Sequence, residues 1–98
     1  MSKIGIAISG GSNPADVIDL VVLAGSLGYE SAWVAEGHGG DQFAILAACA
    51  VRTSRIRLGT SISSVFVRTV PTIAMAASTV ADLSGGRFIL GLGPATKV

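Results

Sequence analysis

The feature that most constrains this chain is a unit that recurs about every 30 residues: a short apolar segment, a polar loop with glycine, and an amphipathic segment with helical spacing. Strands joined through helical crossovers pair in parallel. The order β-α-β-α-β-α-β therefore predicts an α/β fold with a parallel sheet covered by helices. The expected strands are Lys3–Ser9, Ser31–Ala35, Ile56–Ser61 and Arg87–Leu92.

Each helical segment begins behind a residue that can cap it. Asn13, Asp41 and Thr69 have side-chain oxygens that can accept hydrogen bonds from the first free N–H groups of a helix. Pro14 and Pro71 suit a first helical turn, where the missing N–H is not needed. In the first helical segment one apolar stripe is expected to be buried. Its members are Val17, Leu20, Val21, Ala24 and Leu27.

Composition excludes several classes of protein. The 98 residues are 50% hydrophobic and 13% charged, which predicts one domain with a real core, and residues 1–98 are treated as a single, partial domain. A net charge of +1 gives no electrostatic signal for nucleic acid or for an anionic membrane. Neither a membrane span nor a secretory leader is expected, so the predicted location is the cytoplasm. Cys49 is expected to be a small buried hydrophobe, and no metal-ligand set is evident.

Two architectures accept this order of elements: a small doubly wound sheet, or the N-terminal half of a (β/α)8 TIM barrel. The residues alone leave both open. A complete barrel needs roughly 250 residues, so this chain would supply about half of the strands. An isolated half-barrel would expose two unpaired strand edges and one face of its sheet.

The strand over 56–61 ends in a run of small polar residues instead of a tight hairpin. Gly59, Thr60 and Ser61 bring a bare backbone and hydroxyl groups to the carboxyl end of this strand. Parallel α/β folds bind their ligands at that end, so a cofactor is expected there. Gly91 and Gly93 match two glycines of a nucleotide fingerprint, but the third is absent, so a Rossmann interpretation is poor.

Several segments, taken in order and spacing, resemble the N-terminal half of the bacterial luciferase-like superfamily. They are Ser31–Glu36, Gly40–Phe43, Ala50–Thr60, Val65–Arg68 and Leu83–Gly93. Within that superfamily the chain is most similar to the coenzyme F420-dependent oxidoreductases related to methylenetetrahydromethanopterin reductase. The resemblance implies a TIM barrel and hydride transfer between coenzyme F420 and a small-molecule substrate. FMN with monooxygenation is the closest alternative cofactor and reaction.

The resemblance also implies a coenzyme site on the strand expected over residues 56–61. The family has a non-prolyl cis peptide that supports the coenzyme ring, and its position falls on Ser61-Ile62, directly after Thr60. A cis peptide bond without proline costs about 3–4 kcal/mol, so an ordinary trans bond at the strand end is the simpler interpretation. A marked bulge at this point is a third possibility. Gly91 and Gly93 would leave room beside the coenzyme.

Glu36 occupies the family position of an acidic residue that faces the deazaflavin, although the bland interpretation is a solvated loop carboxylate. Many relatives have a histidine directly after this acid. Here Gly37 follows, and His38 comes one position later. Its imidazole titrates near neutrality and could act as an acid or base, but a lone histidine between glycines is more often a surface side chain.

A hypothesis of another class is a non-catalytic half-barrel that assembles with itself or with another subunit. On either hypothesis we expect the isolated 98 residues to be inactive as an enzyme. We also expect them to associate, as a homo-oligomer or with a missing C-terminal half, because the uncovered sheet face and two strand edges need partners.

Overall fold

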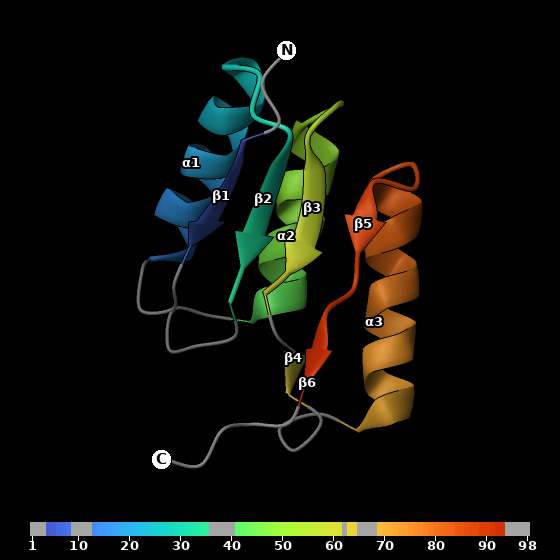
Figure 1. Ribbon diagram of the computed structural model, residues 1–98. Coiled ribbons are helices and arrows are strands. Elements are labelled where there is room, and N and C mark those ends of the chain that lie inside the picture. The colour runs from blue at the N-terminus through green and yellow to red at the C-terminus, as the bar shows by residue number, and fades with distance from the viewer. Residues whose placement is uncertain (1–3, 9–12, 36–40, 62, 65–68, 94–98) are drawn as a thin grey trace.

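The main sheet of the protein has its strands in chain order. The computed structural model describes residues 4–8, 13–35, 41–61, 63–64 and 69–93. Within these ranges the sheet order is β1 (Gly5–Ile8), β2 (Ser31–Val34), β3 (Arg57–Thr60) and β5 (Phe88–Ile89), with every pairing parallel (Figure 1). A doubly wound sheet would place the first strand between two others. The predicted barrel-type order is therefore confirmed.

Each helix begins at the cap that the sequence predicts. The side chain of Asn13 accepts a 2.8 Å hydrogen bond from the Ala15 N–H at the start of α1 (Pro14–Ser26). Asp41 does the same for α2 (Gln42–Arg52), and Thr69 for α3 (Val70–Leu83). These oxygens pair N–H groups that have no partner within the helix, which fixes where each helix starts.

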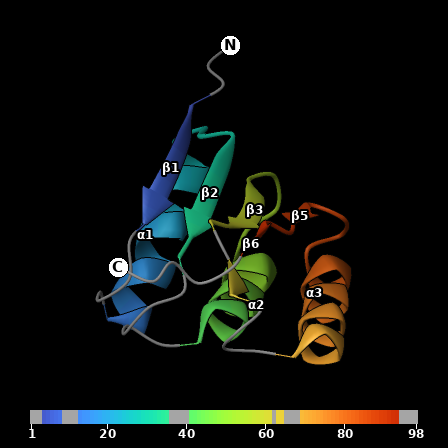
Figure 2. The same ribbon diagram turned by 60° about the horizontal axis from the view of Figure 1, so that its bottom comes forward.

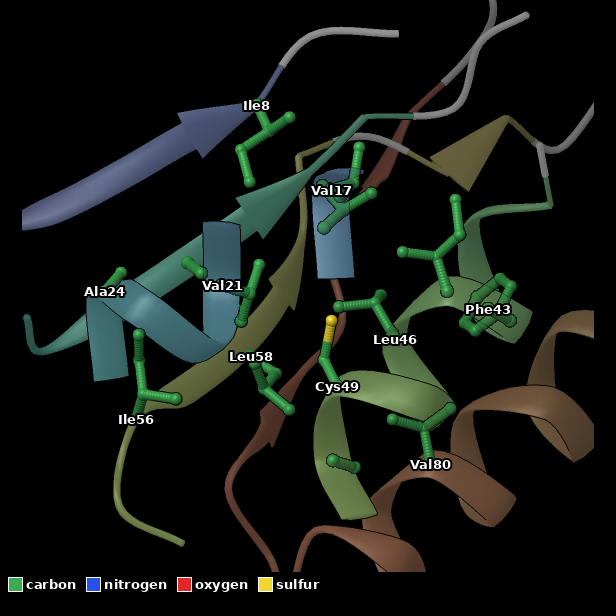
Figure 3. Close-up of a cluster of buried hydrophobic side chains, with 14 of the residues drawn as sticks. Ile8, Val17, Val21, Ala24, Phe43, Leu46, Cys49, Ile56, Leu58 and Val80 are labelled. Carbon is green, nitrogen blue, oxygen red and sulfur yellow. The ribbon is translucent and has the colours of Figure 1, made fainter. Parts of the chain in front are cut away.

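All three helices cover the same face of the sheet, and the core lies between the two layers (Figure 2). Leu58 of β3 and Leu46 and Cys49 of α2 are fully buried there (Figure 3). The stripe predicted on α1 is only partly right: Val17, Val21 and Ala24 are buried, whereas Leu20 is 41% and Leu27 66% exposed. Leu27 is the C-cap residue that follows α1, and neither leucine packs against the buried core.

The opposite face of the sheet has no helix on it among the described residues. Side chains alternate along a strand, so Ala32 and Val34 of β2 point into the helix-covered core while Ser31 and Trp33 point to the other side. The strand register places Trp33 between Ala7 of β1 and Gly59 of β3. We call this side the open face.

Arg87 ties the elements together at the amino ends of the strands. Its guanidinium donates to the carbonyls of Ala50 and Thr53 at the end of α2, at 3.0 Å each, and to Ile56 at the entry to β3 at 2.8 Å. Its Nε donates to the Ser84 carbonyl beyond α3 at 2.6 Å. The last carbonyls of a helix have no hydrogen-bond partner within the helix. The planar guanidinium group of Arg87 can donate to several such carbonyls at once.

We expect Arg87→Met to lower the free energy of unfolding by about 3 kcal/mol, because several part-buried carbonyls lose a charged donor. Lysine should restore only part of this loss, since a single ammonium cannot match the fork. The matched control is Arg52→Met: Arg52 makes one 3.5 Å ion pair with Asp19 and is 53% exposed. Urea unfolding should show a loss of less than about 1 kcal/mol for that control. Equal midpoints for the two methionine variants would contradict the role given to Arg87.

Cys49 provides a test that depends on pH. Burial raises the pKa of its thiol to about 11, against a smaller opposite effect of Arg52. An exposed cysteine thiol has a pKa of about 8.5. Between that pH and about 11, the unfolded chain loses a thiol proton that the folded chain keeps. The contribution of Cys49 to stability is therefore complete below about pH 8.5 and is lost as the pH rises towards 11. We expect wild type to lose more stability than Cys49→Ala between pH 8 and 10.5. Parallel losses in urea unfolding would refute this.

Candidate functional site

The pairing between neighbouring strands is irregular at the carboxyl end of β3. Gly59 pairs with Ile89 of β5, and the ladder resumes where Ser63 of β4 (Ser63–Ser64) pairs with Leu92 of β6 (Leu92–Gly93). The chain advances four residues from Gly59 to Ser63 but three from Ile89 to Leu92. The β3 side is therefore one residue longer than the β5 side across the gap in the pairing. Irregular strand pairing, such as a β-bulge, is frequent beside active sites.

The ends of β2 and β3 are held together at one carbonyl. Val34, the last residue of β2, accepts a 3.0 Å hydrogen bond from the Ser61 N–H and a 2.7 Å bond from the side-chain amide of Gln42. Gln42 is the first residue of α2 and is fully buried. The start of α2 is thereby fixed to the edge where the strands end. Sequence reasoning missed this role, although a glutamine opening an otherwise apolar helix was a usable signal.

The ends of β3 and β5 are held together by a threonine. Thr60 is 1% exposed, and its hydroxyl donates to the Gly91 carbonyl at 2.8 Å and accepts from the Gly91 N–H at 2.6 Å. A side chain thus substitutes for ladder bonds where the strand pairing is interrupted. Thr60 was predicted to bind a cofactor, and that role stays a prediction; its hydroxyl has these two protein partners.

Gly91 has no side chain because the end of β3 occupies the space. A Cβ at this position would lie 2.7 Å from the Thr60 carbonyl oxygen and 3.3 Å from that of Ser61. Alanine would therefore push the two strand ends apart. The glycine is explained by close backbone approach, and its expected role beside a coenzyme stays a prediction.

Just below this edge, the open face is covered by a single aromatic side chain. The Trp33 indole lies against Gly59, where a Cβ would collide with its ring, and its N–H donates to the Ser31 hydroxyl at 3.0 Å. The sequence analysis assigned Trp33 no function. The signal was present, because Trp33 alternates with Ala32 and Val34 and so had to face away from the helices.

The structure brings Thr60, Ser61 and Gly91 together at one edge, as predicted from their positions at strand ends. Gly93 lies in β6, paired with Ser64. Glu36, His38 and Ile62 lie outside the described residues, and so does the Ser61-Ile62 bond for which cis geometry was predicted. Their roles and the bulge expected at this bond stay predictions, and the described residues show that the strand pairing is interrupted around it.

Two hollows lie elsewhere in the molecule. One of about 410 Å³ lies between α2 and α3 and is bordered by apolar residues such as Ala47 and Met75. The other, of about 230 Å³, lies at the amino-end side near Gly25 and Arg55. Neither is lined by the strand-end residues. In the part of the chain described, no three His, Cys, Asp or Glu side chains could share a metal ion. Each helix there is too short or too polar to cross a membrane.

The comparison with known families agrees with this geometry. The model of the luciferase-like monooxygenases matches residues 1–97. The chain belongs to the luciferase-like monooxygenase family.

Relatives and solved structures of this family span the chain almost completely. A Mycobacterium tuberculosis protein, provisionally named a coenzyme F420-dependent oxidoreductase, is 41% identical over 93 residues, or 93% of this chain. The structure of the coenzyme F420-dependent tetrahydromethanopterin reductase from Methanopyrus kandleri matches 96% of the chain with a TM-score of 0.87 and 31% identity. An FMN complex of a type II Baeyer-Villiger monooxygenase from Pseudomonas putida matches 97% with a TM-score of 0.85. That last likeness is at 19% identity and shows the fold alone.

The luciferase-like chain spans only part of each of these proteins. It covers 27% of the Mycobacterium tuberculosis and Methanopyrus kandleri proteins and 30% of the Pseudomonas putida chain. Its four-stranded sheet therefore corresponds to the N-terminal part of a TIM barrel. The chain spans less than a third of the length of those proteins.

Thr60→Val tests the link between the strand ends. Valine keeps the shape of threonine but can neither donate to the Gly91 carbonyl nor accept from its N–H, so we expect stability to fall by about 1–3 kcal/mol. Hydrogen exchange at the Gly91 amide should become faster. Thr60→Ser is the control, since it keeps the hydroxyl and should keep the amide protected. Unchanged protection in the valine variant would show that Thr60 does not hold Gly91.

Proposed function

We propose that this protein is the N-terminal part of an oxidoreductase that transfers hydride between coenzyme F420 and a small-molecule substrate. The observation that carries the proposal is the 41% identity, over 93% of the chain, to a protein named for this coenzyme. The Methanopyrus kandleri reductase, whose name specifies the same coenzyme, adds a second relative at 31% identity. Because the chain covers 27% of each, the activity of the whole protein is inferred and the substrate is left as a class.

The described residues fit a flat, conjugated ring at the strand ends. Ser61 is exposed and Gly91 half-buried at this edge, where the pairing of β3 with β5 is interrupted, so a ring could rest against their backbone. The bond from Ser61 to Val34 and the bonds of Thr60 to Gly91 would hold this surface in shape before the coenzyme arrives.

The division of labour follows from the residue types. The bound coenzyme supplies the hydride chemistry, and the protein supplies binding, orientation and electrostatics. The chain provides a rigid backbone surface at Ser61 and Gly91. Glu36 would face the ring from the end of β2, and His38 could hold or release a proton at its imidazole. Both roles rest on family position.

An FMN-dependent monooxygenase is the second candidate. The matching family is that of the luciferase-like monooxygenases, and the Pseudomonas putida structure, which has the same fold, is a complex with FMN. F420 is preferred because the more similar sequences, at 41% and 31% identity, are both named for it. A non-catalytic half-barrel that assembles with a second copy is the remaining alternative, and it predicts that neither coenzyme binds.

The open face bears on the partners of this chain. Trp33 and Ile89 are only half-buried on it, and Ala7 is exposed. In a closed barrel such side chains fill the interior. We infer that the face is covered either by a C-terminal half of the barrel or by a second copy of the chain, and that the 98 residues alone are inactive. A location in the cytoplasm remains part of the same proposal.

Titration with F420 and with FMN tests the proposal. The purified protein, together with any segment that continues the chain, should bind F420 at least about tenfold more tightly than FMN, a difference of about 1.4 kcal/mol. Coenzyme absorbance and fluorescence report binding directly. Tighter FMN binding would support the monooxygenase alternative. Failure of a folded protein to bind either coenzyme would reject both enzymes and leave the assembly module.

A further inference from the structure

We propose that Trp33 forms the floor of the coenzyme pocket, with the free side of its indole packed against the bound ring system. This inference rests on the proposed function and adds a residue to it. It derives from the way the indole is held on the open face, immediately below the strand ends.

The indole lies across three strands in space that two glycines leave empty. A Cβ on Gly59 of β3 would collide with ring atoms Cζ3 and Cε3, and one on Gly5 of β1 would lie 3.4 Å from the indole nitrogen and 2.5 Å from the Ser31 hydroxyl oxygen. At this height the indole occupies the place of a side chain on β3, and on β1 it lies beside Ala7, the strand partner of Trp33.

The position of the ring is fixed by a hydrogen bond. The indole N–H donates to the Ser31 hydroxyl at 3.0 Å, and Ser31 is itself only 9% exposed. This bond turns the nitrogen edge towards the amino end of the strands and leaves the benzene edge over Gly59. A tryptophan N–H usually has a hydrogen-bond partner when it is buried, and here that partner sets the direction in which the ring points.

The height of the ring matches the proposed ligand. Trp33 pairs with Gly59, the residue directly before Thr60, and Ser61 follows. Ser61, directly after the end of β3, is the next residue on the open face, two residues and about 6.6 Å beyond Gly59 along the strand. A ring system that rests on the Ser61 and Gly91 edge would thus have the indole as the next layer below it. Aromatic rings attract one another beyond their apolar area, so this contact would contribute to affinity.

The experiment replaces Trp33 in the protein together with any segment that continues the chain. Trp33→Leu should weaken F420 binding roughly 3- to 10-fold, as loss of an aromatic pair predicts, and should shift the absorbance band of the bound coenzyme. Trp33→Phe keeps an aromatic face and should recover most of both effects. Gly59→Ala should act like the leucine variant, because its Cβ displaces the indole.

Val80→Ala is the matched control. Val80 is 1% exposed in α3, on the helix-covered side, so its loss lowers stability without touching the open face. The control should leave the spectrum of bound F420 unchanged at a temperature where every variant is folded by circular dichroism. If Trp33→Leu binds F420 with wild-type affinity and spectrum, the floor is refuted while the proposed function stands. If folded wild-type protein binds neither F420 nor FMN, the proposed function and the role of Trp33 are both refuted.

Discussion

Parallel pairing in chain order is the constraint on which the rest of this structure depends. Each crossover from one strand to the next carries a helix, and crossovers of one hand place all of these helices on one side. The same rule brings every strand's carboxyl end to one edge. A buried core under α1, α2 and α3, an open face, and a polar edge at Thr60 and Ser61 are consequences of this single arrangement.

The two ends of the strands are stabilised by different means. At the amino ends, the Arg87 guanidinium binds carbonyls of α2 and of the entry to β3 with charge-assisted hydrogen bonds. At the carboxyl ends, neutral bonds from Ser61, Gln42 and Thr60 hold backbone groups where the ladder is interrupted. TIM-barrel proteins place stability at the first end and chemistry at the second. The anchored end and the end with interrupted pairing thus lie at opposite edges of the same sheet.

The open face links the fold to the proposed chemistry. It contains a tryptophan held by Ser31 and accommodated by Gly59, and it is not covered by any described helix. Apolar groups in such a position become buried only when more protein or a ligand arrives. On the function that we propose, further protein that covers this face would also complete the pocket.

The sequence by itself determined the elements and their order. Caps at Asn13, Asp41 and Thr69 are local, since each oxygen pairs with an N–H two or three residues away, and the strand-helix repeat is equally local. Family resemblance led us to expect an irregular strand end and coenzyme F420. Only the tertiary structure showed the contacts of Arg87 and Trp33. Arg87 meets Ala50 across 37 positions, and Trp33 meets Gly59 across a strand pairing, so both depend on distances that no local pattern encodes.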